Sequence, residues 1–129
     1  RTLDLAVQDQ IEQRLADFVP QFAASFGAEA TVRYARGYPV TVNSPEQTDF
    51  AAQVAGEVVG PERVDADAPP SMGGEDFSFM LEERPGAYIF LGNGDSSELH
   101  TDTYDFNDDV IPVGTSYWVR LAERALPVT

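Results

Sequence analysis

The sequence predicts an α/β fold, and three patterns carry that prediction. Residues 5–26 and 110–126 place apolar side chains at helical spacing. Residues 28–34 instead alternate apolar and polar side chains, which is typical of a strand with one solvated face. A short apolar run at 87–91 lies between glycines and indicates a strand that is buried on both faces and flanked by helices.

The first helix is expected over Leu5–Phe26. Asp4 is a candidate N-cap and Gly27 a candidate C′ residue. Pro20 has no amide donor and is expected to kink or split the helix. With the alternating segment Ala28–Tyr34 behind it, this helix looks like one half of an open-faced α+β sandwich. Its apolar face consists of Val7, Ile11, Leu15, Phe18, Phe22 and Phe26.

Loop signals at 37–45 mark the best domain boundary, and a second helix follows them. Ser44 is placed to cap this helix, with Pro45 at its first position and Gln47 completing a capping box. Gly60 and Pro61 end it.

Two further helices are expected in the second half of the chain. One is short and runs from Glu75 to Glu83. The other runs from about Val110 to Leu126, and Asp108 or Asp109 is expected to be its N-cap.

Composition excludes several classes of function. The chain has 129 residues and 43% apolar residues, enough for a packed core. It has 22 acidic residues against eight basic ones, all arginine, and a formal charge of −14, which argues against binding to nucleic acid or an anionic membrane. There is no cysteine, so disulfides and thiolate metal sites are excluded.

The long segment Gly92–Asp109 is the first candidate for function, because long loops inside compact domains usually bind or move. It carries the only histidine, His100. This residue is either an ordinary surface or hydrogen-bonded loop histidine or a metal ligand, with Asp102 or Asp105 orienting the ring. A catalytic zinc needs about three protein ligands, so one histidine cannot make such a site alone.

The same loop has a partial match to a calcium-binding pattern. Asp105, Asn107 and Asp109 have the spacing of the first three ligands of an EF-hand loop. Its sixth position should be glycine and is Val110, and its twelfth should be glutamate and is Ser116, which argues against that reading.

A second candidate is the glycine pair Gly73 and Gly74, followed by Glu75 and Asp76. Two glycines allow the backbone to approach a ligand closely. The segment reads equally as a turn followed by acidic residues at a helix start.

Several short motifs, taken in order, resemble one family. The chain resembles the amidohydrolase branch of the two-metal aminoacylase–carboxypeptidase family, which includes hippurate hydrolases, auxin-conjugate hydrolases and N-acyl-amino-acid deacetylases. The resemblance covers essentially the whole chain but only the C-terminal third of such an enzyme. The motifs are Arg1-Thr2-Leu3, Gly37-Tyr38-Pro39-Val40-Thr41-Val42-Asn43, Met72-Gly73-Gly74-Glu75-Asp76-Phe77, Pro85-Gly86-Ala87, Phe90-Leu91-Gly92, Leu99-His100 and Tyr104-Asp105-Phe106.

This resemblance implies a fold and an activity. Residues 1–43 correspond to the second half of a lid or dimerisation domain, and residues 44–129 to the C-terminal part of an α/β metallopeptidase catalytic sandwich. The implied reaction is cleavage of an N-acyl amino acid or a related amide by a metal-activated water. The general-base glutamate belongs to segments upstream, so the fragment alone is expected to be inactive.

The resemblance also implies site residues and partners. His100 corresponds to the last metal ligand, and Gly73, Gly74 and Glu75 to a substrate-binding loop. The parent enzyme is expected to hold two divalent ions (Zn, Mn, Co or Ni), which the fragment would bind weakly or not at all, and to form a cytoplasmic homodimer through the lid. Thr101 and Asp102 depart from the expected residues after the ligand. The alternative is a non-catalytic acidic domain that binds a cation or a partner.

Overall fold

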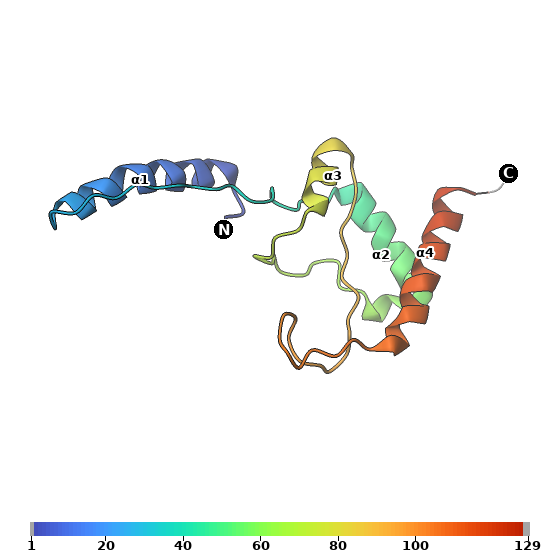
Figure 1. The fold of residues 1–129 in the computed structure, drawn as a ribbon. Coiled ribbons are helices and arrows are strands. Elements are labelled where there is room, and N and C mark those ends of the chain that lie inside the picture. Colours follow the sequence, from blue (N-terminus) through green and yellow to red (C-terminus); the bar gives the residue numbers. More distant parts are fainter. Residues whose placement is uncertain (1, 128–129) are drawn as a thin grey trace. The chain divides into compact units, whose positions relative to one another are not determined.

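The computed structural model describes residues 2–127, and its regular elements are helices joined by irregular segments (Figure 1). Arg1, the first residue of the motif Arg1-Thr2-Leu3, lies outside the described residues. The chain divides into two compact units. The first contains the chain up to Val42 together with Pro70–Glu83, and the second contains Asn43–Pro69 and the chain from Arg84 onward.

Helix α1 (Leu5–Ala24) belongs to the first unit and begins at the predicted cap. The backbone amide of Val7 donates to the Asp4 carboxylate at 2.9 Å, which satisfies one of the free amides of the first turn. The helix ends in a turn where Gly27 has a φ of +70°, a conformation that favours glycine. Pro20 lies inside α1 and does not divide it, so of the two expected effects, a kink or a split, the split does not occur.

The chain after α1 runs back alongside the helix as an uncoiled segment (Figure 1). The guanidinium of Arg36 joins the two, donating to Asp9 at 2.6 Å and to Glu12 from its Nε at 2.8 Å. These hydrogen bonds, to Glu12 first and then to Asp9, raise the pKa of Arg36. Among the described residues, the salt bridges between α1 and this segment are those of Arg36, and they are exposed to solvent.

The predicted α/β fold is wrong for this chain. Residues 2–127 contain helices and no strand, so neither the α/β catalytic sandwich nor half of an α+β sandwich is present in them. Ala28–Tyr34 and Ala87–Leu91 have the strand-like patterns but no neighbouring strand. A strand forms only when its backbone is hydrogen-bonded to a neighbouring strand. The apolar and polar pattern of a segment indicates which face it would bury, but it does not show that a neighbouring strand is present.

In the second unit, the side chain of Asn43 forms hydrogen bonds with the backbone of Tyr88, as a neighbouring strand would. Its Nδ2 donates to the carbonyl of Tyr88 and its Oδ1 accepts from the amide of Tyr88, both at 2.8 Å. One residue along, the amide of Ser44 donates to the carbonyl of Gly86 at 2.9 Å. The segment 86–88 is thus held along one edge by the residues that precede the second helix.

Helix α2 (Pro45–Val59) begins and ends as predicted, but its cap differs. Ser44 is the N-cap residue and Pro45 the first helical residue, yet the Ser44 hydroxyl makes no capping bond and accepts from the amide of Gly86 instead. The predicted capping box with Gln47 is therefore wrong. Gly60 ends the helix with a φ of +90°, and a short 3-10 turn, η1 (Pro61–Arg63), follows.

Helix α4 (Ile111–Ala125) packs against α2 and forms the core of the second unit (Figure 1). Ala51, Val54 and Tyr117 are its buried side chains among the described residues. Glu57 on α2 adds an ionic link, because Arg120 Nε donates to it at 2.5 Å and Arg124 donates to its other oxygen.

The described residues leave much apolar surface uncovered. The apolar side chains along α1 and the turn after it, which we call the α1 stripe, are between 38% and 74% exposed: Val7, Ile11, Leu15, Phe18, Phe22 and Phe26. Among the described helices, none is both long enough and apolar enough to cross a bilayer.

Candidate functional site

The His100 loop, defined here as residues 93–107, lies in the second unit between the segment 87–91 and a short 3-10 turn, η2 (Asp108–Val110). It contains no helix, as predicted. His100 is exposed and has a φ of +65°, and it is the one non-glycine residue with positive φ in the described chain. Histidine tolerates this left-handed conformation better than most residues, but it remains uncommon.

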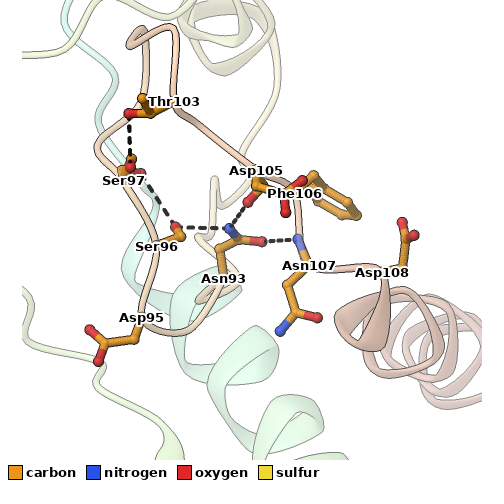
Figure 2. Close-up of a pocket in the computed structure, with 9 residues that line it drawn as sticks. All are labelled: Asn93, Asp95, Ser96, Ser97, Thr103, Asp105, Phe106, Asn107 and Asp108. Atoms are coloured by element: carbon orange, nitrogen blue, oxygen red, sulfur yellow. Dashed lines mark hydrogen bonds between the residues drawn. The ribbon is translucent and has the colours of Figure 1, made fainter.

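Side chains, rather than a backbone ladder, hold the two arms of the His100 loop together (Figure 2). At the base, Asn93 Nδ2 donates to the carbonyl of Asp105 at 2.9 Å, and Asn93 Oδ1 accepts from the amide of Asn107 at 2.8 Å. Asn93 Nδ2 also donates to the hydroxyl of Ser96 at 3.0 Å. One amide group therefore joins three points of the loop.

A second bridge lies nearer the tip. The hydroxyl of Thr103 donates to the hydroxyl of Ser97 at 3.0 Å (Figure 2). Between these residues, the hydroxyl of Thr101 donates to the carbonyl of Glu98 at 2.7 Å. His100 thus occupies a short tip bounded by the Ser97–Thr103 bridge.

The arms of the loop border a polar pocket of about 780 Å³ (Figure 2). Nine residues between Asn93 and Asp108 line it, including the carboxylates of Asp95, Asp105 and Asp108. His100 is not among them.

The start of the last helix differs from the prediction. Neither Asp108 nor Asp109 is its N-cap; instead Asn107 accepts from the amide of Asp109 at 3.0 Å and caps η2, and both aspartates lie in the first turn of η2. Asn107 therefore has two roles, since its own amide is held by Asn93.

The second predicted site, Gly73 to Glu75, lies in the first unit just before α3 (Phe77–Glu83). Gly73 is exposed, and a Cβ placed on it would meet only the Ser71 hydroxyl, at 3.5 Å. Glu75 lies two residues before the helix and accepts from its first turn: its carboxylate accepts from the amide of Phe77 at 3.1 Å, and its carbonyl accepts from the buried hydroxyl of Ser78 at 2.5 Å.

Comparison with known proteins identifies the family. The sequence profile of the peptidase family M20/M25/M40 matches residues 4–124. The chain belongs to this family. The match extends over α1, α2, α3, the His100 loop and most of α4, so both units fall within it.

Several curated members of the family are similar to the chain. A hippurate hydrolase of Campylobacter jejuni is 32% identical over 126 residues, which are 98% of this chain and 33% of the relative. An N-acetyl-L-cysteine deacetylase of Bacillus subtilis is 28% identical over 98% of this chain and 30% of the relative. An N-acetyldiaminopimelate deacetylase of Exiguobacterium sibiricum is 33% identical over 87% of this chain and 30% of the relative.

The chain therefore spans about a third of the length of the curated relatives it matches. The resemblance to the hippurate hydrolase and deacetylase branch, and to a part of such an enzyme, is confirmed. No solved structure matches the chain.

Members of this family typically bind divalent metals, and the donor set of the chain fits one position of such a site. In residues 2–127, the imidazole of His100 makes no hydrogen bond or ion pair, so its nitrogens are available to an ion. Neither Asp102 nor Asp105 orients the ring through a hydrogen bond. The described part of the chain holds no group of three or more histidine, aspartate or glutamate side chains placed to bind a metal, so it does not fit a complete site.

The sequence-based prediction missed the residues that shape the His100 loop. Asn93 is followed by Gly94, whose φ is +81°, and an Asn-Gly pair is a strong turn signal that could have drawn attention to this position. The long-range bonds of Asn93 to Asp105 and Asn107 have no comparable signal, because nothing in a sequence pairs residues 12 and 14 positions apart in a loop.

Proposed function

We propose that this chain is the C-terminal part of a metal-dependent amidohydrolase that cleaves an N-acyl amino acid or a related amide. The observation that carries the proposal is the match of the family profile to residues 4–124. The relatives named above act, by their names, on hippurate, N-acetyl-L-cysteine and N-acetyldiaminopimelate, and each of these compounds is an acylated amino acid. A substrate of the same class follows for the protein that carries this chain.

In this proposal His100 is one ligand of a centre that holds two divalent ions, Zn, Mn, Co or Ni. The other ligands and the general-base glutamate come from polypeptide outside residues 1–129. Such ions supply an activated water and stabilise the oxyanion that develops on the amide carbonyl. Two features support this role of His100. Its imidazole is exposed and has no hydrogen-bond partner among the described residues, and it lies at the tip of a loop whose two arms are joined by side-chain hydrogen bonds.

The segment Gly73, Gly74 and Glu75 is proposed to contact the substrate. Gly73 does not have a positive φ, and its surroundings leave space for a Cβ. Within the described chain, neither backbone conformation nor packing therefore requires glycine at this position. Close approach of another molecule or segment is a physical reason for a residue without a side chain.

Residues 1–43 are proposed to belong to a lid domain through which the protein forms a homodimer. The exposed α1 stripe supports an additional covering surface, since apolar faces of this extent are normally buried.

The decisive experiment replaces His100 by alanine in the full-length gene product. We expect the loss of activity on N-acyl amino acids to exceed the ~10–100-fold that removal of an outer partner of a metal ligand causes. Bound metal, measured by elemental analysis, should fall in parallel. Glu98→Gln is the matched control, because Glu98 is also exposed at the tip and only its backbone carbonyl takes part in the loop. Normal metal content and activity in His100→Ala would contradict the proposal.

The competing idea of an acidic cation-binding domain has a separate test. Calorimetric titration of the 129-residue chain with calcium should give no micromolar binding, because the described residues contain no cluster of three suitable ligands. Micromolar binding by the chain alone would favour a binding domain over an enzyme fragment.

A further inference from the structure

We propose that Asn93 is the positioning residue for His100: its side-chain amide closes the base of the His100 loop and so fixes where the imidazole is presented. This inference rests on the proposed role of His100 as a metal ligand. It assigns to Asn93 an effect on metal affinity without contact between Asn93 and the ion.

The geometry of the loop gives Asn93 this role. Its amide joins Asn93 to the carbonyl of Asp105 and the amide of Asn107, 12 and 14 residues away. Among the described residues, no backbone–backbone hydrogen bond joins the two arms of the loop; the one backbone bond inside it, from Tyr104 to the carbonyl of Thr101, lies at the tip. The base of the loop is therefore closed by a side chain.

Closing the base restricts the conformations open to the tip. Without the Asn93 bridge, the arms would be held only by the exposed Ser97–Thr103 hydroxyl pair, and a loop of this length gains conformational freedom when its ends separate. A metal would then have to order the loop as it bound His100, which lowers its affinity. A ligand held in place beforehand avoids that cost.

The chemistry of the bridge suits asparagine. Its side chain donates to a carbonyl from Nδ2 and accepts from an amide at Oδ1, so two separate atoms of one short, planar group reach the two partners. Asn93→Asp keeps the acceptor for Asn107 but removes the donor to Asp105 and places a carboxylate beside its carbonyl oxygen. Ser96→Ala removes a peripheral bond of Asn93 and leaves the bridge intact, so it is the matched control.

The test measures the metal dissociation constant of the full-length gene product by competition with a chelator, for either zinc or cobalt. We expect Asn93→Ala and Asn93→Asp to weaken binding by about 10–100-fold, the range for residues that orient metal ligands. Ser96→Ala should change it by less than about threefold, since the bond between Asn93 and Ser96 lies within one arm and does not join the two arms.

A double mutant separates positioning from a general effect on the fold. If Asn93 acts through His100, Asn93→Ala has no further effect on metal affinity in a His100→Ala background. An equal loss in both backgrounds would overturn the inference, as would normal affinity in Asn93→Ala. If His100→Ala itself leaves metal binding unchanged, the proposed function fails, and that result is distinct from a failure confined to Asn93.

A second bridge keeps the test decisive if the Asn93 variants do not fold. Thr103→Val removes the hydroxyl pair next to the tip and leaves the base intact. Weaker metal binding that disappears in the His100→Ala background would support positioning by the bridges of the loop. Unchanged binding in Thr103→Val, together with unfolded Asn93 variants, would overturn it.

Discussion

Helix α1 carries the longest apolar stripe of the chain, yet none of its residues is buried, whereas α2 and α4 carry shorter stripes and bury Ala51, Val54 and Tyr117. Helices α1 and α4 were predicted from the same signal, apolar side chains at helical spacing. The ends of α1 are fixed locally, by the Asp4 cap and by the turn at Gly27. The difference lies in what covers the apolar face: α2 and α4 cover each other, and nothing in the described first unit covers the α1 stripe.

The comparison separates two properties that a helical pattern combines. The pattern and the caps determine that a segment is helical and which face is apolar. They do not supply the surface against which that face packs. A helix can therefore be predicted accurately in a chain that does not contain its partner.

The largest expected effect is a contrast between two substitutions that introduce a carboxylate, one at a buried and one at an exposed position. Val54 is 0% exposed and Leu15 is 38% exposed. In the 129-residue chain, Val54→Asp should destabilise the α2–α4 pair by about 4 kcal/mol or more, because it buries an unpaired carboxylate. Leu15→Asp should change the unfolding midpoint very little. Thermal unfolding followed by circular dichroism measures both.

The same pair in the full-length gene product sharpens the contrast. If polypeptide outside this chain covers the α1 stripe, Leu15→Asp becomes strongly destabilising there, and the two substitutions have similar effects. A Leu15→Asp protein as stable as the unmodified full-length protein would show that the stripe stays exposed, and would contradict the proposed lid domain.

The helices were predicted largely correctly from the sequence, whereas the strands were not. The start of α1 at Asp4, the N-cap position of α2 and the boundaries of α3 and α4 follow from contacts within a few residues. The strands at Ala28–Tyr34 and Ala87–Leu91 require hydrogen bonds to distant segments, and the described chain has no such segments. The prediction of strands in these two segments was therefore wrong, because a strand-like pattern forms a sheet only where a partner segment is present.

The candidate site was also predicted only in part. His100 and its long loop were found from composition, because the chain has a single histidine, and from the absence of any periodic pattern around it. The side chains that shape that loop, Asn93 at the base and Ser97 with Thr103 near the tip, were not predicted. Their partners are set by the folded path of the loop, and the sequence gives no register for contacts between side chains of a loop.

The buried phenol of α4 provides a second test, in alkaline solution. Burial raises the pKa of Tyr117 above its usual value near 10. Above that value the unfolded chain loses the proton before the folded chain does, so stability should fall as the pH rises through the pKa of the folded state. Tyr117→Phe should remove this part of the alkaline loss. The midpoint of unfolding, measured between pH 8 and pH 11, gives the comparison.

Tyr34 is the control for this titration, because it lies in the first unit and no core of two packed helices surrounds it. Tyr34→Phe should leave the alkaline loss as it is in the unmodified chain. Equal effects of the two substitutions would mean that the loss does not arise from burial between α2 and α4.

The smallest expected effect concerns the ionic links of the two units. Glu57→Gln removes the negative charge and one of the two oxygens that accept from Arg120 and Arg124 between α2 and α4, and should lower stability by about 0.5–1 kcal/mol at low salt. The loss should shrink as salt is added, because the groups are partly exposed and the Debye length falls to about 3 Å at 1 M. Glu12→Gln removes the charge pair of Arg36 with Glu12 and leaves the one with Asp9, in a helix that has no buried residue, and should leave the unfolding midpoint unchanged. An equal shift for both variants would indicate that α1 unfolds together with the α2–α4 core. The two units would then differ in how much apolar surface they expose and not in how they unfold.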